Sequence, residues 1–176
     1  MSNSPHRSFE KITRDDLARL AQIARADFAD LCQRQEYSSP YADRLRLLCL
    51  CQGAARHYVH GDRGVQDFDL WGFFEAIPDH KFPYRRRGTH DFGTSKFGRN
   101  PDDGDSFKGR RVDVIGRSIS IAENETPIES LLRYLREKRT KSARLLAERP
   151  VIVVWPEKYL GQIIWDGQPV AKAPIC

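Results

Sequence analysis

Residues 45–71 read LRLLCLCQGAARHYVHGDRGVQDFDLW, and this stretch decides the fold. It begins with the apolar run Leu45–Cys51, which has the length and composition of a buried strand. Gly53 follows that run, and residues 55–59 have a composition compatible with a helix. A glycine-rich turn then returns the chain into a second apolar segment, residues 65–71. The stretch therefore predicts a strand, a glycine turn, a helix and a second strand in succession.

Two aspartates occupy the second predicted strand. Successive side chains of extended backbone point to opposite faces, so Asp67 and Asp69 emerge together on one face. Phe68 and Leu70 then enter the core. Aspartate is depleted in strands, and a shared divalent cation is a physical reason for two carboxylates at this spacing. An Asp-x-Asp triplet by itself is more often a turn or a helix cap, so the interpretation as a metal site depends on the elements around it.

The glycine turn before the predicted helix is one such element. Gly53 lets the backbone approach a phosphate closely, and the first N–H groups of the helix then point at that phosphate. The turn Gly53-Ala54 therefore predicts a phosphate site beside the metal site.

A third predicted strand, residues 110–115, carries one more carboxylate. Val112 and Val114 can face the core, which leaves Arg111, Asp113 and Arg117 on the opposite face. Asp113 would then lie among cations, which favour the ionised form of a carboxyl group.

These three elements resemble the nucleotidyltransferase superfamily of the DNA polymerase beta type. Its pattern is a glycine turn, a short spacer and an Asp-x-Asp or Asp-x-Glu between apolar residues, with a third carboxylate on a later strand. The resemblance covers roughly residues 44–120. It implies an α+β fold, a nucleotidyltransferase-like palm whose mixed β-sheet has flanking helices.

The resemblance also implies a chemistry, the transfer of a nucleotidyl group from a nucleoside triphosphate to an acceptor hydroxyl with two Mg²⁺ ions. Asp67, Asp69 and Asp113 are then the metal ligands, and Asp113 also helps to activate the acceptor hydroxyl. The backbone of Gly53 and Ala54 cradles the phosphates. The cations predicted to neutralise the triphosphate or the acceptor are Lys96, Arg99, Arg111 and Arg117.

The chain departs from the family pattern in the glycine turn. Gln52 stands where the family has an apolar residue, and Ala54 stands where it has Gly or Ser. The missing hydroxyl favours an alternative, a nucleotidyltransferase-fold module that does not catalyse and binds nucleic acid or a partner protein. A nuclease and a sugar-nucleotide transferase fit less well, because the chain lacks the Asp/Glu-x-Lys element of the first and the long nucleotide-binding segment of the second.

Composition sets the outer limits. With 176 residues the chain is predicted to form a single domain, residues 1–176. A net charge of +5 permits an anionic partner, so RNA or another protein is a possible acceptor. No apolar run approaches the roughly 20 residues that span a bilayer, and residues 1–7 lack a signal-peptide core, so we expect no membrane association and a cytoplasmic location.

The remaining segments give five further expectations. A helix begins after Thr13, and another begins after Thr126 and extends through Leu145. The segment at about 78–108 is predicted to be a basic loop insertion. Its residues 81–99 interleave basic and aromatic side chains, a composition that suits a nucleic-acid backbone and equally a solvated basic loop. Residues 102–105 are predicted to be a polar turn rather than a calcium loop, and residues 71–74 are predicted to fill the core.

Overall fold

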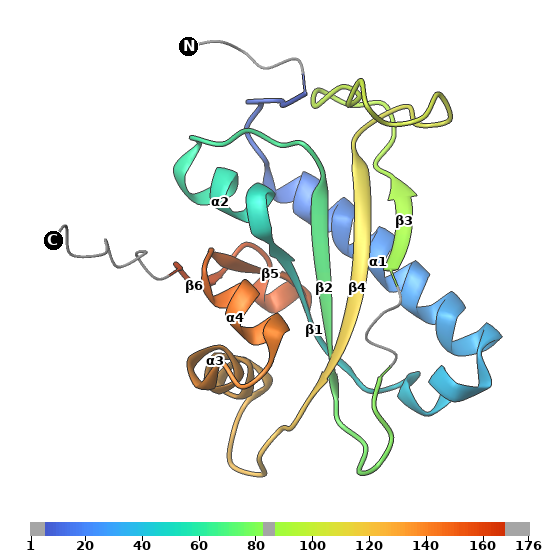
Figure 1. Ribbon diagram of the computed structural model, residues 1–176, viewed down its shortest axis with the longest axis vertical. Coiled ribbons are helices and arrows are strands. Elements are labelled where there is room, and N and C mark those ends of the chain that lie inside the picture. The colour runs from blue at the N-terminus through green and yellow to red at the C-terminus, as the bar shows by residue number, and fades with distance from the viewer. Residues whose placement is uncertain (1–5, 83–86, 168–176) are drawn as a thin grey trace, which may run out of the picture.

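The computed structural model describes residues 6–82 and 87–167. Over these residues the chain has an α+β fold, in which a mixed six-stranded sheet is flanked by helices (Figure 1). In chain order the elements are α1 (Arg14–Arg34), η1 (Glu36–Tyr41), β1 (Leu45–Cys51), α2 (Gln52–His60), β2 (Phe68–Glu75), β3 (Arg87–Asp91), β4 (Arg111–Ile119), α3 (Pro127–Glu137), α4 (Lys141–Ala147), β5 (Val151–Trp155), η2 (Glu157–Tyr159) and β6 (Ile163–Trp165). The α+β class predicted from the sequence is confirmed.

The strand order brings the two aspartate-bearing segments together. The sheet runs β3-β4-β2-β1-β5-β6, with β2 and β4 parallel and every other neighbouring pair antiparallel. Asp69 on β2 lies directly opposite Asp113 on β4, and Cys51 at the end of β1 lies opposite Asp69 on the other side. Because α2 begins directly after Cys51, its N-terminus lies at the same end of the sheet as the aspartates.

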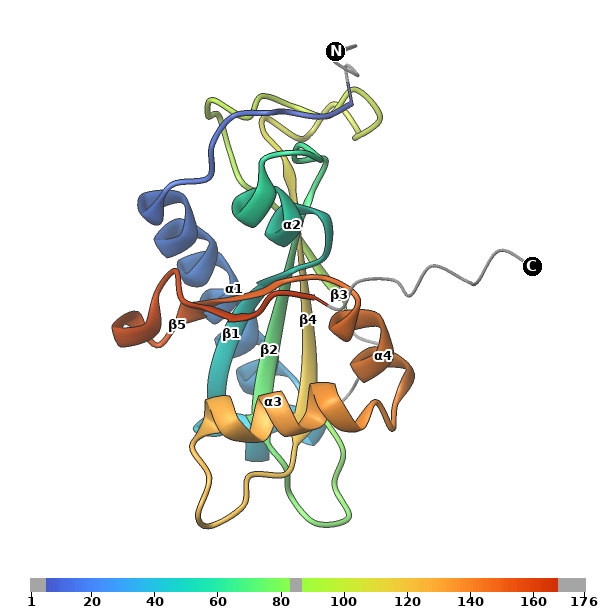
Figure 2. The same ribbon diagram turned by 90° about the vertical axis from the view of Figure 1, so that its left-hand side faces the viewer.

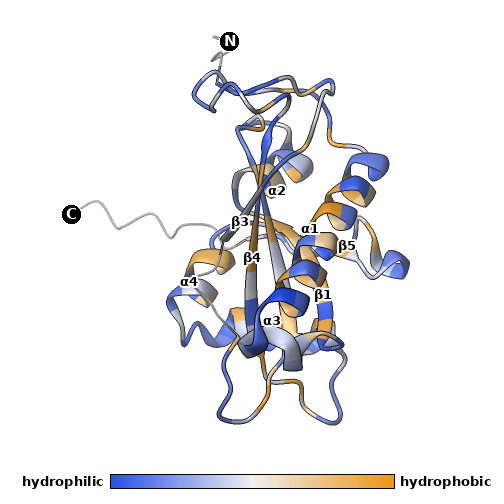
Figure 3. Ribbon diagram, turned by 90° about the vertical axis from the view of Figure 1, so that its right-hand side faces the viewer, coloured by the Kyte–Doolittle hydropathy of each residue, from blue (hydrophilic) through white to orange (hydrophobic). Residues whose placement is uncertain are grey.

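Helices cover both faces of the sheet. Helix α1 packs its apolar side chains on one face, where Phe28, Phe74 and Phe82 form an aromatic cluster. Helices α3 and α4 bury Leu131 and Leu146 against the other face. Figure 2 shows α1 and α4 on opposite sides of the central strands. Figure 3 shows hydrophobic and hydrophilic residues alternating along α1, the pattern of an amphipathic helix.

Both long helices begin where the sequence predicts. Thr13 caps α1 in a capping box with Asp16, and Thr126 caps α3 in a capping box with Glu129. The prediction of one helix from Thr126 through Leu145 is wrong. The chain turns at Lys138, whose φ of 50° is left-handed, and Thr140 caps a separate helix, α4.

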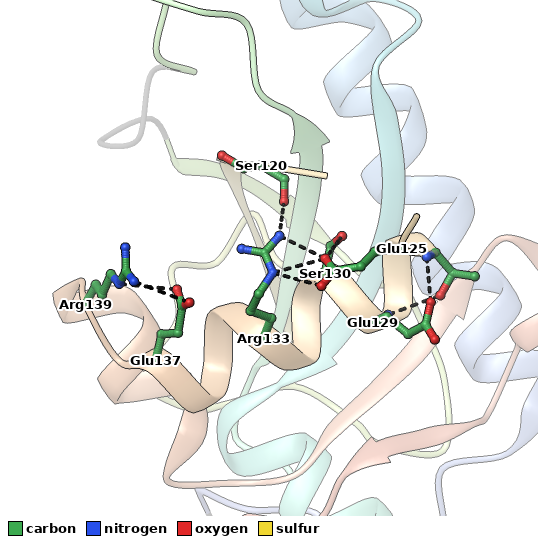
Figure 4. A network of polar contacts seen from close by, with 8 residues as sticks. Ser120, Glu125, Glu129, Ser130, Arg133, Glu137 and Arg139 are labelled. Carbon is green, nitrogen blue, oxygen red and sulfur yellow. Dashed lines mark hydrogen bonds and ion pairs between the residues drawn. The ribbon is translucent and has the colours of Figure 1, made fainter. Parts of the chain in front are cut away.

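The basic character of α3 is partly structural. Arg133 donates to both carboxylate oxygens of Glu125, at 2.9 to 3.1 Å, and to the backbone carbonyl of Ser120 at 3.0 Å (Figure 4). Glu125 also accepts a hydrogen bond from Ser130. Arg133 therefore ties the start of α3 to the end of β4, and this basic residue is explained without a nucleic-acid partner.

Two further boundaries differ from the sequence prediction. The second strand is shifted, because Val65 forms an isolated bridge with Ser8 and β2 begins only at Phe68. The predicted loop at about 78–108 contains an edge strand, β3, which pairs with β4. The basic residues at 85 and 86 in this segment lie outside the described residues.

Asp91, at the end of β3, fixes the following loop, residues 92–110. Its carboxylate accepts hydrogen bonds from the backbone N–H groups of Gly93 at 2.9 Å, Lys108 at 2.7 Å and Gly109 at 2.9 Å. Burial opposes ionisation of this carboxyl group, but the three backbone hydrogen bonds outweigh burial and lower the pKa of Asp91. One ionised side chain, that of Asp91, therefore holds the two ends of the loop together.

We expect Asp91→Asn to destabilise the protein by about 1 to 2 kcal/mol near neutral pH, because an amide cannot accept all three bonds. The native pKa of Asp91 lies below the unfolded value, so its contribution is present above the ordinary carboxyl pKa of 3.8 and is lost as the pH falls through the native pKa. Urea unfolding should therefore separate variant and wild type near pH 7 and less so near pH 3. Asp105→Asn is the control, because Asp105 is fully exposed in the same loop. An equal loss in both variants would contradict this role of Asp91.

Candidate functional site

A cavity of about 350 Å³ opens at the end of the sheet where α2, β2 and β4 begin. Figure 1 shows α2 beside the upper ends of β2 and β4. The volume falls within the range of small-molecule sites. The cavity is lined by Arg7, Gln52, Gly53, Ala54, Gln66, Asp67, Asp69, Trp71, Arg111, Asp113, Ile115, Leu145 and Arg149.

The three predicted aspartates all line this cavity. Asp67 directly precedes β2, Asp69 lies on β2, and Asp113 lies on β4 opposite Asp69. Adjacent strands are about 4.8 Å apart, so the carboxylates of Asp69 and Asp113 can share one ligand. Asp113 is only 2% exposed and accepts a hydrogen bond of 3.0 Å from the hydroxyl of Thr89 on β3. The structure therefore brings all three predicted aspartates to one cavity.

Arg111 lies among the acidic side chains as an internal cation. Its guanidinium makes ion pairs with Asp67 at 3.0 Å, Asp113 at 3.4 Å and Asp103 at 3.6 Å. Burial disfavours the guanidinium charge, but the charges of Asp113 and Asp67 outweigh burial and raise the pKa of Arg111. The carboxylates of this site therefore have a counter-ion supplied by the chain itself.

Sequence reasoning did not find Asp103. It lies in the loop of residues 92–110, in the segment predicted to be a polar turn, and is only 9% exposed. One of its carboxylate oxygens contacts Arg111, and the other has no hydrogen-bond partner among the described residues. The burial of Asp103 has no local sequence signal, because it depends on how the loop packs and on the contact with Arg111 of β4.

The donor chemistry of the site suits a hard cation. Asp67, Asp69 and Asp113 present carboxylate oxygens, the ligands that Mg²⁺ prefers in proteins. No group of three or more His, Cys, Asp or Glu side chains in the described parts of the chain has its donors drawn together as a ready-made ion cage. Arg111 pairs with both Asp67 and Asp113. The carboxylate oxygens match the ligand preference of a hard cation, and in this structure a guanidinium neutralises them.

The start of α2 forms the second part of the site. Gln52 has a left-handed φ of 60°, and the N-cap residue Cys51 makes no side-chain capping bond. The first N–H groups of α2 therefore receive no cap from that residue. A Cβ placed on Gly53 would lie 4.0 Å from a guanidinium nitrogen of Arg149, so this cation lies directly over the glycine. A helix N-terminus with an arginine above it is suited to an anion.

Arg149 and Arg7 are cavity residues that sequence reasoning missed. Arg149 follows α4, and Arg7 lies in the N-terminal segment, where it donates to the side chain of Gln66 at 3.3 Å. Both arginines are far in sequence from the glycine turn and the aspartates. Only the packing of α4 and of the N-terminal segment around α2 brings them to the site, so no local pattern could have identified them.

Three of the four predicted phosphate-binding cations do not line the cavity. Lys96 pairs with Asp16 on α1 at 2.9 Å, and Arg99 pairs with Asp105 at 3.2 Å within its own loop. The structure therefore places Lys96 and Arg99 away from the site that they were predicted to join. Arg117 also lies outside the lining, where it contacts the ring of Trp71 at 5.1 Å.

The cysteines near the site are structural. Cys49 and Cys51 are free, fully buried and part of the core beneath α3 and α4. Burial raises the pKa of the Cys51 thiol, and the charges of Cys49 and Asp69 raise it further. The thiol next to Asp69 is therefore neutral and adds no nucleophile to the site.

None of the protein-family models, curated proteins and solved structures compared with the chain matches it. No described helix has the length and apolar character needed to cross a membrane.

Proposed function

We propose that this protein is a metal-dependent nucleotidyltransferase, which transfers a nucleotidyl group from a nucleoside triphosphate to an acceptor hydroxyl. One observation carries the proposal. Asp67, Asp69 and Asp113 converge from two adjacent strands on a cavity that also contains the N-terminus of α2. Carboxylates for divalent cations beside a helix N-terminus for phosphates are the two requirements of phosphoryl transfer.

Each part of the cavity has a role in this reaction. The acceptor oxygen attacks the α-phosphorus, its proton passes to a carboxylate such as Asp113, and pyrophosphate leaves. The backbone N–H groups of Gly53 and Ala54, with the Arg149 guanidinium, bind the polyphosphate. Mg²⁺ held by the aspartates would stabilise the charge on the attacking and leaving oxygens. Arg111, which pairs with Asp67 at 3.0 Å and lines the same cavity, would supply positive charge beside the polyphosphate.

The direct test is binding of nucleoside triphosphate with and without Mg²⁺, measured by calorimetry, together with transfer of label from the α-phosphate to RNA or to protein. We expect binding in the micromolar to millimolar range that is lost when the metal is chelated. If no nucleoside triphosphate binds in the presence of Mg²⁺, the proposal is overturned.

A second candidate function rests on the Arg111 contacts. A module that does not catalyse keeps Arg111 paired with Asp67 and Asp113, and the missing hydroxyl at Ala54 agrees with it. Such a module should bind RNA without metal, and the affinity should fall steeply with salt. Salt-insensitive binding would argue against this candidate.

A prediction for Gly53 separates phosphate binding from folding. In Gly53→Ala the new Cβ meets only the Arg149 guanidinium, at 4.0 Å, so the free energy of unfolding should stay within about 0.5 kcal/mol of wild type. The methyl group keeps a phosphate away from the backbone, so the affinity for tripolyphosphate should fall roughly tenfold. Calorimetric titration gives the affinity, and Gly104→Ala in the exposed loop serves as the control because its Cβ meets only Ser106 at 4.0 Å. Equal affinities for Gly53→Ala and wild type would contradict a phosphate site at this glycine.

A further inference from the structure

The cavity changes character along the strands. At one end it has Asp69 and Asp113 opposite each other, and the next pair facing the same side is Trp71 and Ile115. Two residues along a strand correspond to roughly 7 Å. Leu145 of α4 lies with this second pair in the cavity lining. The site is therefore charged beside the start of α2 and apolar further along β2 and β4.

Trp71 contributes a polar atom to the apolar end. The residue is only 4% exposed, and its indole nitrogen has no hydrogen-bond partner among the described residues. A buried indole N–H is a donor only and normally finds an acceptor. Trp165 shows this normal case, because its indole N–H donates to the backbone carbonyl of Ala147 at 3.0 Å. The indole N–H of Trp71 differs from that of Trp165 in this respect.

A second donor in the same cavity has the same property. The side-chain nitrogen of Gln52 is buried and has no partner in the described parts of the chain. Two buried donors without acceptors at one cavity indicate a ligand that carries hydrogen-bond acceptors.

The ring of Trp71 is held in place by its neighbours. Arg117 lies over the ring at 5.1 Å and is itself anchored by Ser142 at 2.9 Å and by the backbone carbonyl of Gly116 at 2.8 Å. That face of the indole is covered by the guanidinium, so base stacking there is blocked. The unpaired N–H group lies at the edge of this ring, and Trp71 belongs to the cavity lining.

We propose that the indole N–H of Trp71 donates a hydrogen bond to the heteroaromatic base of a nucleoside triphosphate and so contributes to the choice of base. This inference rests on the proposed function. The base is flat, carries ring-nitrogen or carbonyl acceptors at its edge, and fits between Ile115 and Leu145, while the triphosphate extends towards Gly53 and Arg149. Trp71 is then a specificity-determining residue, since only a base with an acceptor at the matching position satisfies it.

The test follows the indole N–H signals of the ¹⁵N-labelled protein by NMR. The chain contains three tryptophans, and Trp155→Phe and Trp165→Phe identify the signal of Trp71 by elimination. Titration with Mg²⁺ and either ATP, GTP, CTP or UTP should shift the Trp71 proton downfield, most strongly for one base. Tripolyphosphate should leave it unchanged, and the Trp165 signal should not respond to any of these probes. In Trp71→Phe the affinity for the preferred nucleotide should fall roughly tenfold, with the tripolyphosphate affinity retained.

The outcomes separate this inference from the proposed function. If a nucleotide binds with Mg²⁺ but shifts the Trp71 signal no more than tripolyphosphate does, the base contact is wrong and the nucleotidyltransferase proposal stands. If all four nucleotides shift the signal equally, Trp71 does not select the base and the inference is overturned. If no nucleotide binds, both proposals fail together.

Discussion

Asp69→Asn is expected to reduce the rate of Mg²⁺-dependent nucleotidyl transfer by roughly a thousandfold or more, while the protein stays folded. Asp69 is a partly exposed carboxylate at the centre of the cavity, opposite Asp113 on the neighbouring strand. Asparagine keeps the shape of the side chain but removes the negative charge that would hold a divalent cation in the proposed reaction, where metal stabilisation of phosphoryl transfer contributes several kcal/mol. Transfer of label from the α-phosphate of a nucleoside triphosphate measures the rate, and thermal unfolding measures the fold.

The matched control for this variant is Asp62→Asn. Asp62 is an exposed carboxylate that pairs with Arg56 at 2.7 Å, and such surface pairs contribute little to stability. Its rate should equal that of wild type. An Asp69→Asn protein with wild-type transfer would show that this carboxylate holds no catalytic metal.

The second large effect is expected in the core. In Gly116→Ala the new Cβ would lie 2.0 Å from the ring of Phe82, far inside the contact distance of two carbon atoms. That ring cannot move aside, because it stacks on Phe74 at 4.3 Å and contacts Tyr41 at 5.2 Å. We expect a loss of about 3 kcal/mol or more in the free energy of unfolding, measured by urea denaturation.

Gly53→Ala is the reference for this second prediction. The same substitution adds a Cβ with no close neighbour there, so its stability should match wild type. A third glycine gives an independent check, since a Cβ on Gly72 would lie 2.3 Å from Phe28 in the same aromatic cluster. If Gly116→Ala unfolds at the wild-type urea concentration, the packing of Phe82 against β4 is wrong.

The sequence predicted the part of the site that depends on strand alternation. Asp67 and Asp69 share a face, and Val112 and Val114 enter the core around Asp113, because the side-chain period of a strand is a local property. The turn predicted at Gly53 is wrong, because α2 already begins at Gln52 and Gly53 lies in its first turn. The left-handed residue at this junction is Gln52, with a φ of 60°.

The rest of the site depends on contacts between distant segments. Arg149 reaches the cavity from the segment after α4, and Asp103 reaches Arg111 from a long loop. Nothing in the immediate sequence of either residue marks it. Lys96 was predicted to join the site because of its charge, but it is held by Asp16 on α1. Long basic side chains in loops can reach several partners, so their sequence does not identify which one they contact.

Elements were missed where the chain lacks the usual signals. Strand β3 contains few apolar residues and is an edge strand, so it exists because of its pairing with β4 rather than its own hydrophobicity. The break between α3 and α4 is at Lys138, whose backbone is left-handed. A glycine at this position would have predicted the end of the helix from the sequence.

The parallel pairing of β2 with β4 has a consequence for how the protein folds. Arg111 and Asp67 are 44 positions apart in the sequence, and β3 and its loop come between β2 and β4 along the chain. Contacts of such high sequence separation carry a large loop-closure entropy and tend to form late. Because Asp113 and Arg111 enter on the same strand, the third carboxylate and its counter-ion are expected to reach the site in one step. During synthesis, only two of the three aspartates would thus be in place at the site until residues beyond β4 have been made.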